Sequence, residues 1–155
     1  MPPTVVALFR TPAKREPMIP VTRLTLLAET GAEGDRHARR GSRRQLLLMD
    51  AESLEHFALE PGAVREQVTT RGLDLERLVF GARLRVGSAL LEVTAPCAPC
   101  ERMNELRSGL RDAIRCRRGR FVRILEAGEI GVGDAIHAES DAVPRPGVAE
   151  RSGTA

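Results

Sequence analysis

The segment RLRVGSALLEVTAPCAPC, residues 83–100, decides the fold that the sequence predicts and also carries its most reactive side chains. Two β-patterned runs, 83–86 and 89–94, flank Gly87-Ser88, a two-residue loop of the type that closes a β-hairpin. The second run leads directly into a loop with two cysteines and two prolines. The segment therefore predicts a β-hairpin that ends in a loop bearing thiols.

Short strands and glycine turns recur on both sides of this hairpin. Further strands are predicted at residues 4–9, 21–29, 45–49, 64–70, 121–126 and 135–138, and loops at 10–20 and 31–41. Helical segments are predicted at residues 51–59, with Asp50 as the N-cap, and at 74–78, 101–106 and 110–116. Long helices do not alternate with the strands, which disfavours a doubly wound fold. The predicted fold is mainly β: a closed or partly open β-barrel with a few short helical insertions.

Length and composition fit one domain with an aliphatic core. A chain of 155 residues is long enough to bury a core of ordinary size. We expect a single domain over residues 1–139 and a flexible tail over 140–155, where Pro, Gly, Ser and charged residues dominate. Aromatic residues make up only 3% of the chain. This composition argues against nucleic acid as a partner, because unpaired bases are bound on aromatic platforms.

The charge balance is mildly basic, with 24 Lys and Arg against 21 Asp and Glu and a net charge of +3. It suits a small anionic ligand without requiring DNA or RNA. No run approaches the roughly 20 apolar residues of a membrane-spanning helix, and the first residues lack the features of a signal peptide. Three cysteines are too few for a secreted disulfide scaffold. We therefore expect a cytoplasmic protein without a membrane partner.

The cysteine loop has several candidate roles. Cys97 and Cys100 could be small buried hydrophobes, a redox pair, or two ligands of a structural zinc ion completed by Cys116 and a histidine. A fourth role is a single soft thiolate for a transition metal that an organic cofactor mainly holds. The two prolines favour a surface or cleft loop over a packed strand. Irregular ligand spacing disfavours zinc, the lack of an α/β pattern disfavours a redox pair, and Cys116 lies on a basic turn where an incidental role is expected.

Two further segments combine arginine with glycine or hydroxyl groups. The first contains Gly34, Asp35, Arg36 and His37 and is followed by Arg39, Arg40, Arg43 and Arg44; the second contains Arg65, Thr69, Thr70, Arg71 and Gly72. Backbone amides beside glycine and guanidinium forks both suit an anion. Asp35 and His37 could act as an acid–base pair, although a turn-capping Asp and a hydrogen-bonded His are the usual roles.

The order of these motifs resembles the MOSC domain, the module named for the C-terminal part of molybdenum cofactor sulfurase. The resemblance spans residues 5–136 and rests on GDRHA (34–38), Arg44-Gln45, PGAVREQVTTRGLDL (61–75), GARLRVG (81–87), LEVT (91–94), Pro99-Cys100 and GEIGVGD (128–134). Short members often have Asn where this chain has Gln67, and an aromatic residue where it has Val64.

The resemblance implies a β-barrel that binds the molybdenum–pterin cofactor (Moco) through one functional cysteine. In short members this cysteine follows Pro, after a Glu-Val-Thr strand end, and the spacing favours Cys100 over Cys97 as the metal ligand and catalytic residue. The resemblance implies that the arginines hold the pterin phosphate and that the threonines hydrogen-bond the cofactor. The implied cofactor-binding residues are Arg36, His37, Arg65, Thr69, Thr70 and Arg71.

Two mechanisms follow from the resemblance. As an oxidoreductase similar to the amidoxime-reducing enzymes, the protein would ligate molybdenum through Cys100 and reduce N-hydroxylated compounds, with electrons from a separate donor protein. As a sulfur carrier, Cys100 would hold a persulfide sulfur and deliver it to the cofactor of a partner enzyme. A third, non-catalytic role is binding or storage of the cofactor.

Overall fold

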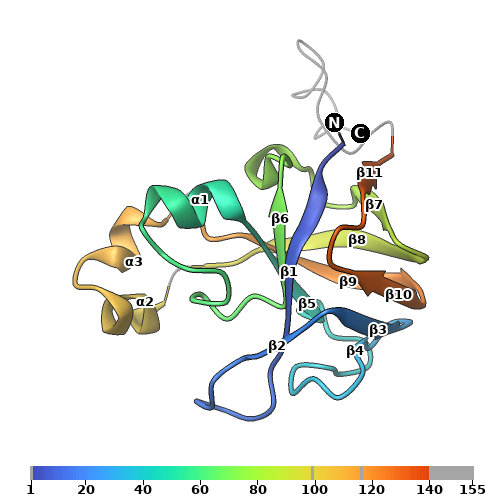
Figure 1. The fold of residues 1–155 in the computed structure, drawn as a ribbon, viewed down its shortest axis with the longest axis horizontal. Coiled ribbons are helices and arrows are strands. Elements are labelled where there is room, and N and C mark those ends of the chain that lie inside the picture. The colour runs from blue at the N-terminus through green and yellow to red at the C-terminus, as the bar shows by residue number, and fades with distance from the viewer. Residues whose placement is uncertain (1, 99, 116, 140–155) are drawn as a thin grey trace.

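The computed structural model describes residues 2–98, 100–115 and 117–139 and is built mainly from strands (Figure 1). The strands are β1 (Thr4–Arg10), β2 (Ile19–Val21), β3 (Arg23–Leu27), β4 (Gly31–Ala32), β5 (Leu46–Asp50), β6 (Val68–Arg71), β7 (Arg83–Val86), β8 (Ala89–Pro96), β9 (Arg120–Glu126), β10 (Gly128–Gly131) and β11 (Ile136–Ala138). The helices are α1 (Ala51–His56), α2 (Glu101–Leu106), α3 (Leu110–Ala113) and the 3-10 turn η1 (Leu75–Arg77). Pro99, Cys116 and the predicted tail over 140–155 lie outside the described residues.

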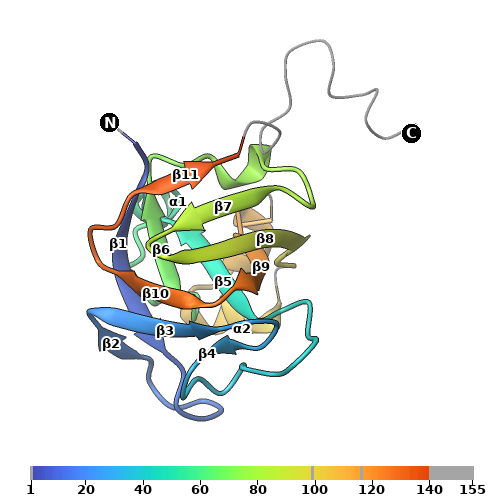
Figure 2. The same ribbon diagram turned by 90° about the vertical axis from the view of Figure 1, so that its right-hand side faces the viewer.

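Eight strands form one curved sheet in the order β11-β7-β8-β9-β5-β6-β1-β2, and β10, β3 and β4 form a second sheet (Figure 2). In the larger sheet only β5 and β6, which α1 connects, run parallel. Within the described residues the edge strands β11 and β2 do not pair, and a single bridge, Thr4 to Ala135, joins β1 to the segment before β11. The mainly β fold with short helices is confirmed. The closed form of the barrel is wrong, because no ladder joins the edge strands β11 and β2 among the described residues.

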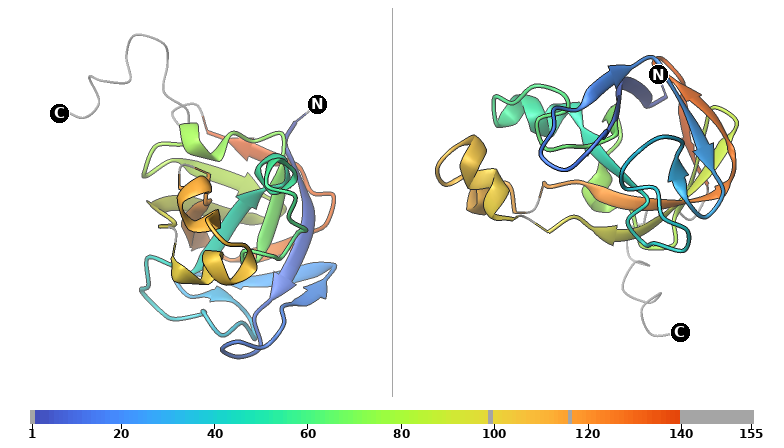
Figure 3. Two further views of the ribbon diagram at one scale, coloured as in Figure 1. Left: turned by 90° about the vertical axis from the view of Figure 1, so that its left-hand side faces the viewer. Right: turned by 90° about the horizontal axis from the view of Figure 1, so that it is seen from below.

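The molecule has two apolar clusters on opposite sides of β5. The larger cluster is formed by the strands and contains Leu48, and the smaller one lies under the helices and contains Met49. Successive side chains of a strand point to opposite faces, so this one strand serves both clusters. Figure 1 and the right-hand view of Figure 3 show the three α-helices together on one side of the strands. Among the described residues, no helix has the length and apolar character needed to cross a membrane.

The hairpin of β7 and β8 has the predicted register, with Arg83 opposite Glu92 and Val86 opposite Ala89. The helix at 101–106 also has its predicted limits. By contrast, β2, β4 and β10 were not predicted, because each has only two to four residues and contains Gly or Pro. The strand predicted at 64–70 is shorter and begins at residue 68. Residues 64–67 therefore lie outside β6, although the Gln67 carbonyl oxygen accepts a hydrogen bond from the Phe9 N–H at 2.8 Å.

Candidate functional site

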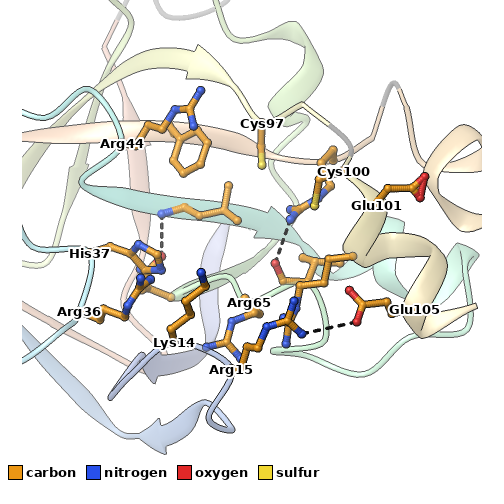
Figure 4. Close-up of a pocket in the computed structure, with 16 residues that line it drawn as sticks. Lys14, Arg15, Arg36, His37, Arg44, Arg65, Cys97, Cys100, Glu101 and Glu105 are labelled. Carbon is orange, nitrogen blue, oxygen red and sulfur yellow. Dashed lines mark hydrogen bonds and ion pairs between the residues drawn. The ribbon is translucent and has the colours of Figure 1, made fainter.

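A pocket of about 510 Å³ lies where β5, the end of β8 and the start of β9 meet the helices (Figure 4). Seven of its lining side chains are cationic: Lys14, Arg15, Arg36, Arg44, Arg65, Arg102 and Arg118. Only two lining side chains, Glu101 and Glu105, are carboxylates. Because like charges gathered in a cleft focus their field, the pocket attracts anionic ligands.

Both cysteines of the 97–100 loop face this pocket (Figure 4). Cys97 is only 9% exposed, whereas Cys100 is exposed at the residue before α2. Burial raises the pKa of the Cys97 thiol, and the neighbouring charges of Arg118 and Arg44 oppose that shift only in part. Cys97 is therefore a neutral thiol at pH 7, and Cys100 is the thiol that a ligand or partner can reach.

The buried carboxylate of Asp35 holds the glycine-rich loop in place. Its oxygens accept hydrogen bonds from the backbone N–H groups of Thr11 and His37, and from Nε2 of Gln67 at 3.1 Å. The other end of the Gln67 amide accepts a hydrogen bond from the Leu47 N–H at 2.8 Å, which ties the loop to β5. With three donors on one carboxylate, the structure supports the turn-capping role of Asp35 rather than a role in proton transfer.

Arg65 fixes a second wall of the pocket. Its backbone adopts a left-handed conformation with φ of 64°. Its guanidinium donates hydrogen bonds to the carbonyl oxygens of Glu16 at 2.8 Å and Ala13 at 3.4 Å, so it also holds the loop that carries Lys14. Partial burial lowers the pKa of Arg65, and the nearby cations Arg102 and Arg36 lower it further. An anion in the pocket would relieve this crowding of positive charge.

His37 lies on the same wall as Arg65. Partial removal from water lowers the pKa of its imidazole, and the cations Arg36 and Arg65 add to this effect, while Asp35 opposes it. The imidazole is therefore neutral at pH 7. A neutral imidazole at a pocket wall can exchange a proton with a ligand.

Three of the predicted cofactor-binding residues do not line this pocket. Thr69 is buried in β6, where its hydroxyl donates a hydrogen bond to Glu66 at 2.8 Å. Thr70 is also buried, and its hydroxyl has no partner among the described residues. Arg71 is exposed and pairs with Glu55 of α1. The pocket thus unites four of the seven predicted site residues: Arg36, His37, Arg65 and Cys100.

The structure adds Arg118, which the sequence placed on a basic turn with no assigned role. Its side chain lines the pocket and is 6% exposed. Gly119 follows with φ of +105°, and a Cβ there would collide with the Leu48 carbonyl oxygen. Only glycine accepts this conformation readily, and it allows the chain to turn from Arg118 into β9. The Gly119 carbonyl also accepts a hydrogen bond from the Cys97 N–H at 3.2 Å.

The zinc role considered for the cysteines has no support in the described part of the chain. Across residues 2–98, 100–115 and 117–139, no three His, Cys, Asp or Glu side chains gather closely enough to hold a metal ion. Cys116, which that role required, lies outside these ranges.

The chain matches the MOSC domain over residues 35–137, which is well over half of its length. The chain therefore belongs to the MOSC domain family, which is associated with binding of the molybdenum cofactor. The resemblance seen in the sequence is confirmed. No curated protein sequence gives a match.

Solved structures with this fold come from several bacteria. The YuaD protein from Bacillus subtilis is 19% identical, with a TM-score of 0.74, 89% of this chain covered and 96% of that chain. YiiM from Escherichia coli is 22% identical, with a TM-score of 0.69 and coverage of 88% and 70%. YiiM from Geobacillus stearothermophilus is 21% identical, with a TM-score of 0.73 and coverage of 96% and 78%. These likenesses establish the fold of the chain.

Proposed function

We propose that the pocket binds the molybdenum–pterin cofactor and that Cys100 is a ligand of its metal. The observation that carries the proposal is that one pocket sets an accessible thiol against a wall of arginines. Thiolate sulfur is a soft ligand of the kind that such metals accept, and guanidinium forks suit a phosphate group. The partnerless nitrogens of Arg118 fit the same group, because a buried cation gains from an anionic ligand.

Different residues would bind different parts of the cofactor. Arg36 and Arg65 would hold the phosphate from the loop side, and the bonds of Arg65 to backbone carbonyls already orient its guanidinium. Cys100 would hold the metal from the opposite wall. Residues outside the pocket lining are not proposed as direct contacts, which applies to Thr69, Thr70 and Arg71.

As the reaction we propose reduction of N-hydroxylated compounds. The bound cofactor would supply two-electron oxygen-atom transfer. The chain would supply the fixed thiolate of Cys100, the positive charge that orients the ligands, and the neutral His37 imidazole as the group that exchanges a proton. We propose that the electrons come from a separate donor protein.

Metal and pterin analysis of the freshly purified protein, followed by turnover assays, tests this proposal. We expect about one molybdenum and one pterin per chain, and loss of an N-hydroxylated substrate only when an electron donor is added. Protein expressed in cells that cannot make the cofactor is the matched control and should be inactive. Absence of both metal and pterin from protein made in cofactor-producing cells would contradict the proposal.

A second candidate function, sulfur transfer, is favoured by the exposure of Cys100. A persulfide on an exposed thiol can be reached by a partner enzyme, whereas one on buried Cys97 cannot. Cyanide-labile sulfur bound to Cys100, present in the wild type and absent from Cys100→Ser, would support the carrier role. Bound molybdenum and donor-dependent turnover without such sulfur would support the reductase role.

A further inference from the structure

Arg118 differs from the six other cations of the pocket because it is the only one that is buried. Its Nη2 donates a hydrogen bond to the Val64 carbonyl oxygen at 3.1 Å. Its Nε and Nη1 are buried and have no hydrogen-bond partner among the described residues. Buried guanidinium groups are normally paired, since an unpaired buried charge is costly. The arrangement therefore lacks an anion.

The buried carboxyl group of Glu66 does not supply that anion through an ion pair in the described part of the chain. Glu66 is fully buried and lies close enough to influence Arg118 electrostatically, but the two form no ion pair within 4.0 Å in the described part of the chain. Glu66 Oε2 accepts hydrogen bonds from the Gly62 N–H at 2.9 Å and the Thr69 hydroxyl at 2.8 Å, and Glu66 Oε1 is buried without a partner among the described residues. Burial also raises the pKa of Glu66, which weakens it as a counter-charge.

The neighbouring thiol is not the anion either. Cys97 is close enough for Arg118 to act on its charge, but burial raises the pKa of the Cys97 thiol and keeps it neutral. Val64, whose carbonyl oxygen accepts the hydrogen bond from Arg118, is apolar and buried, as is Leu47 in the lining of the same pocket. Within residues 2–98, 100–115 and 117–139, Arg118 therefore has no paired counter-charge, and an anion bound in the pocket would supply one.

We propose that Arg118 forms an oxyanion-binding subsite at the cysteine end of the pocket, and that it binds a phosphate or carboxylate group of a ligand. The Val64 carbonyl holds one nitrogen and leaves Nε and Nη1 as donors of charge-assisted hydrogen bonds. In the proposed subsite the guanidinium turns toward the ligand, so that these two nitrogens, which are buried in the structure, donate to its oxygens. The subsite deepens the proposed function and rests on it for the role of the pocket as a ligand site.

The anion has two sources with the same chemistry: the phosphate of the cofactor, or an anionic substituent of the substrate. Phosphate binding by the cofactor-loaded protein distinguishes these two sources. If the loaded protein no longer binds free phosphate, the cofactor fills the subsite. If loaded and cofactor-free proteins bind phosphate equally and both depend on Arg118, the subsite receives an anionic substrate. Either result supports the subsite.

Calorimetric titration of cofactor-free protein with inorganic phosphate, at constant ionic strength set with NaCl, tests the subsite. Arg118→Met should weaken phosphate binding by about tenfold or more, because it removes charge-assisted hydrogen bonds. Arg118→Lys should weaken it less. Arg77→Met is the matched control: it removes one exposed arginine that does not line the pocket, and it should leave phosphate binding unchanged.

Nuclear magnetic resonance of the wild type keeps the test decisive if Arg118→Met does not fold. The Nε–H signal of Arg118, assigned from Arg118→Lys, should shift as phosphate is added and should not shift with NaCl. Unchanged phosphate affinity in Arg118→Met, even with a lowered Tm, would overturn the proposal, as would an unmoved Arg118 signal at saturating phosphate. Arg118-dependent phosphate binding in a protein that never carries molybdenum would uphold the subsite and reject the cofactor.

Discussion

Arg65 and Arg71 lie six positions apart in one continuous segment, yet they belong to different parts of the molecule. Arg65 precedes β6, adopts a left-handed backbone conformation and lines the cationic pocket. Arg71 ends β6 and pairs with Glu55 on α1, outside the pocket. Between them, the side chains of Thr69 and Thr70 are buried in the sheet. The difference shows that the position at which a strand begins decides which residues of a motif can reach a ligand.

The wall of the pocket that carries Arg36 is held by the buried hydrogen bonds of Asp35. Removing these hydrogen bonds should have the largest effect on the stability of the protein. Asp35→Ala removes the acceptor for three donors and should lower the free energy of unfolding by about 3 kcal/mol. Denaturant unfolding measures this. Asp74→Ala is the control, because Asp74 is exposed and makes no capping hydrogen bond, and its effect should stay within about 0.5 kcal/mol. Equal effects of the two substitutions would show that the Asp35 network is not needed.

Replacing Arg65 and Arg71 by methionine, one at a time, tests the comparison directly. Arg65→Met should weaken binding of the cofactor by about tenfold or more, because a charge-assisted contact is lost in a partly buried site. Arg71→Met should leave the affinity unchanged, since only an exposed ion pair is removed. Cofactor reconstitution followed by titration measures both. A larger loss of cofactor affinity in Arg71→Met than in Arg65→Met would place the ligand near Arg71, outside the pocket.

The buried carboxyl of Glu66, beside Arg65, should give the protein a pH dependence of stability. Burial raises the pKa of Glu66 above its usual 4.5 in the folded protein. The folded state therefore binds the proton more tightly, and the contribution of Glu66 is full below pH 4.5 and lost as the pH rises through the folded-state pKa. Urea titrations across this pH window measure the free energy of unfolding. Its decline with rising pH should be smaller in Glu66→Gln than in the wild type. An unchanged decline in Glu66→Gln would assign it to other groups.

The two threonines should give the smallest effects and should differ from each other. Thr69→Val removes a hydrogen bond to Glu66 and should destabilise the protein by about 1 kcal/mol. Thr70→Val removes a buried hydroxyl that has no partner among the described residues, so it should be neutral or slightly stabilising. Thermal unfolding compares them. Neither should change cofactor content, and loss of cofactor from Thr70→Val would return this residue to the binding site.

Local signals in the sequence predicted much of the fold. The Gly87-Ser88 turn gave the correct hairpin register, and Asp50 caps α1 with a hydrogen bond to the Ser53 N–H at 3.0 Å. Features that depend on distant contacts were not predicted. The three short strands β2, β4 and β10 exist only because a neighbouring strand pairs with them.

The candidate site, like the fold, was predicted only in part. The resemblance to the MOSC domain pointed to Arg36 and Cys100, and both line the pocket. The sequence could not reveal that Arg118 is buried, because its neighbours in the chain are charged and its burial comes from packing beside Val64 and Cys97. Nor could it show that Thr69 and Thr70 face into the sheet, because that depends on where β6 begins.

The central claim is that Cys100, and not Cys97, holds the metal of a cofactor in this pocket. Molybdenum analysis of the wild type, Cys100→Ser and Cys97→Ser, each purified from cofactor-producing cells, tests it most directly. We expect about one molybdenum per chain in the wild type, loss of the metal from Cys100→Ser, and retention in Cys97→Ser. Loss from Cys97→Ser with retention in Cys100→Ser would contradict the account.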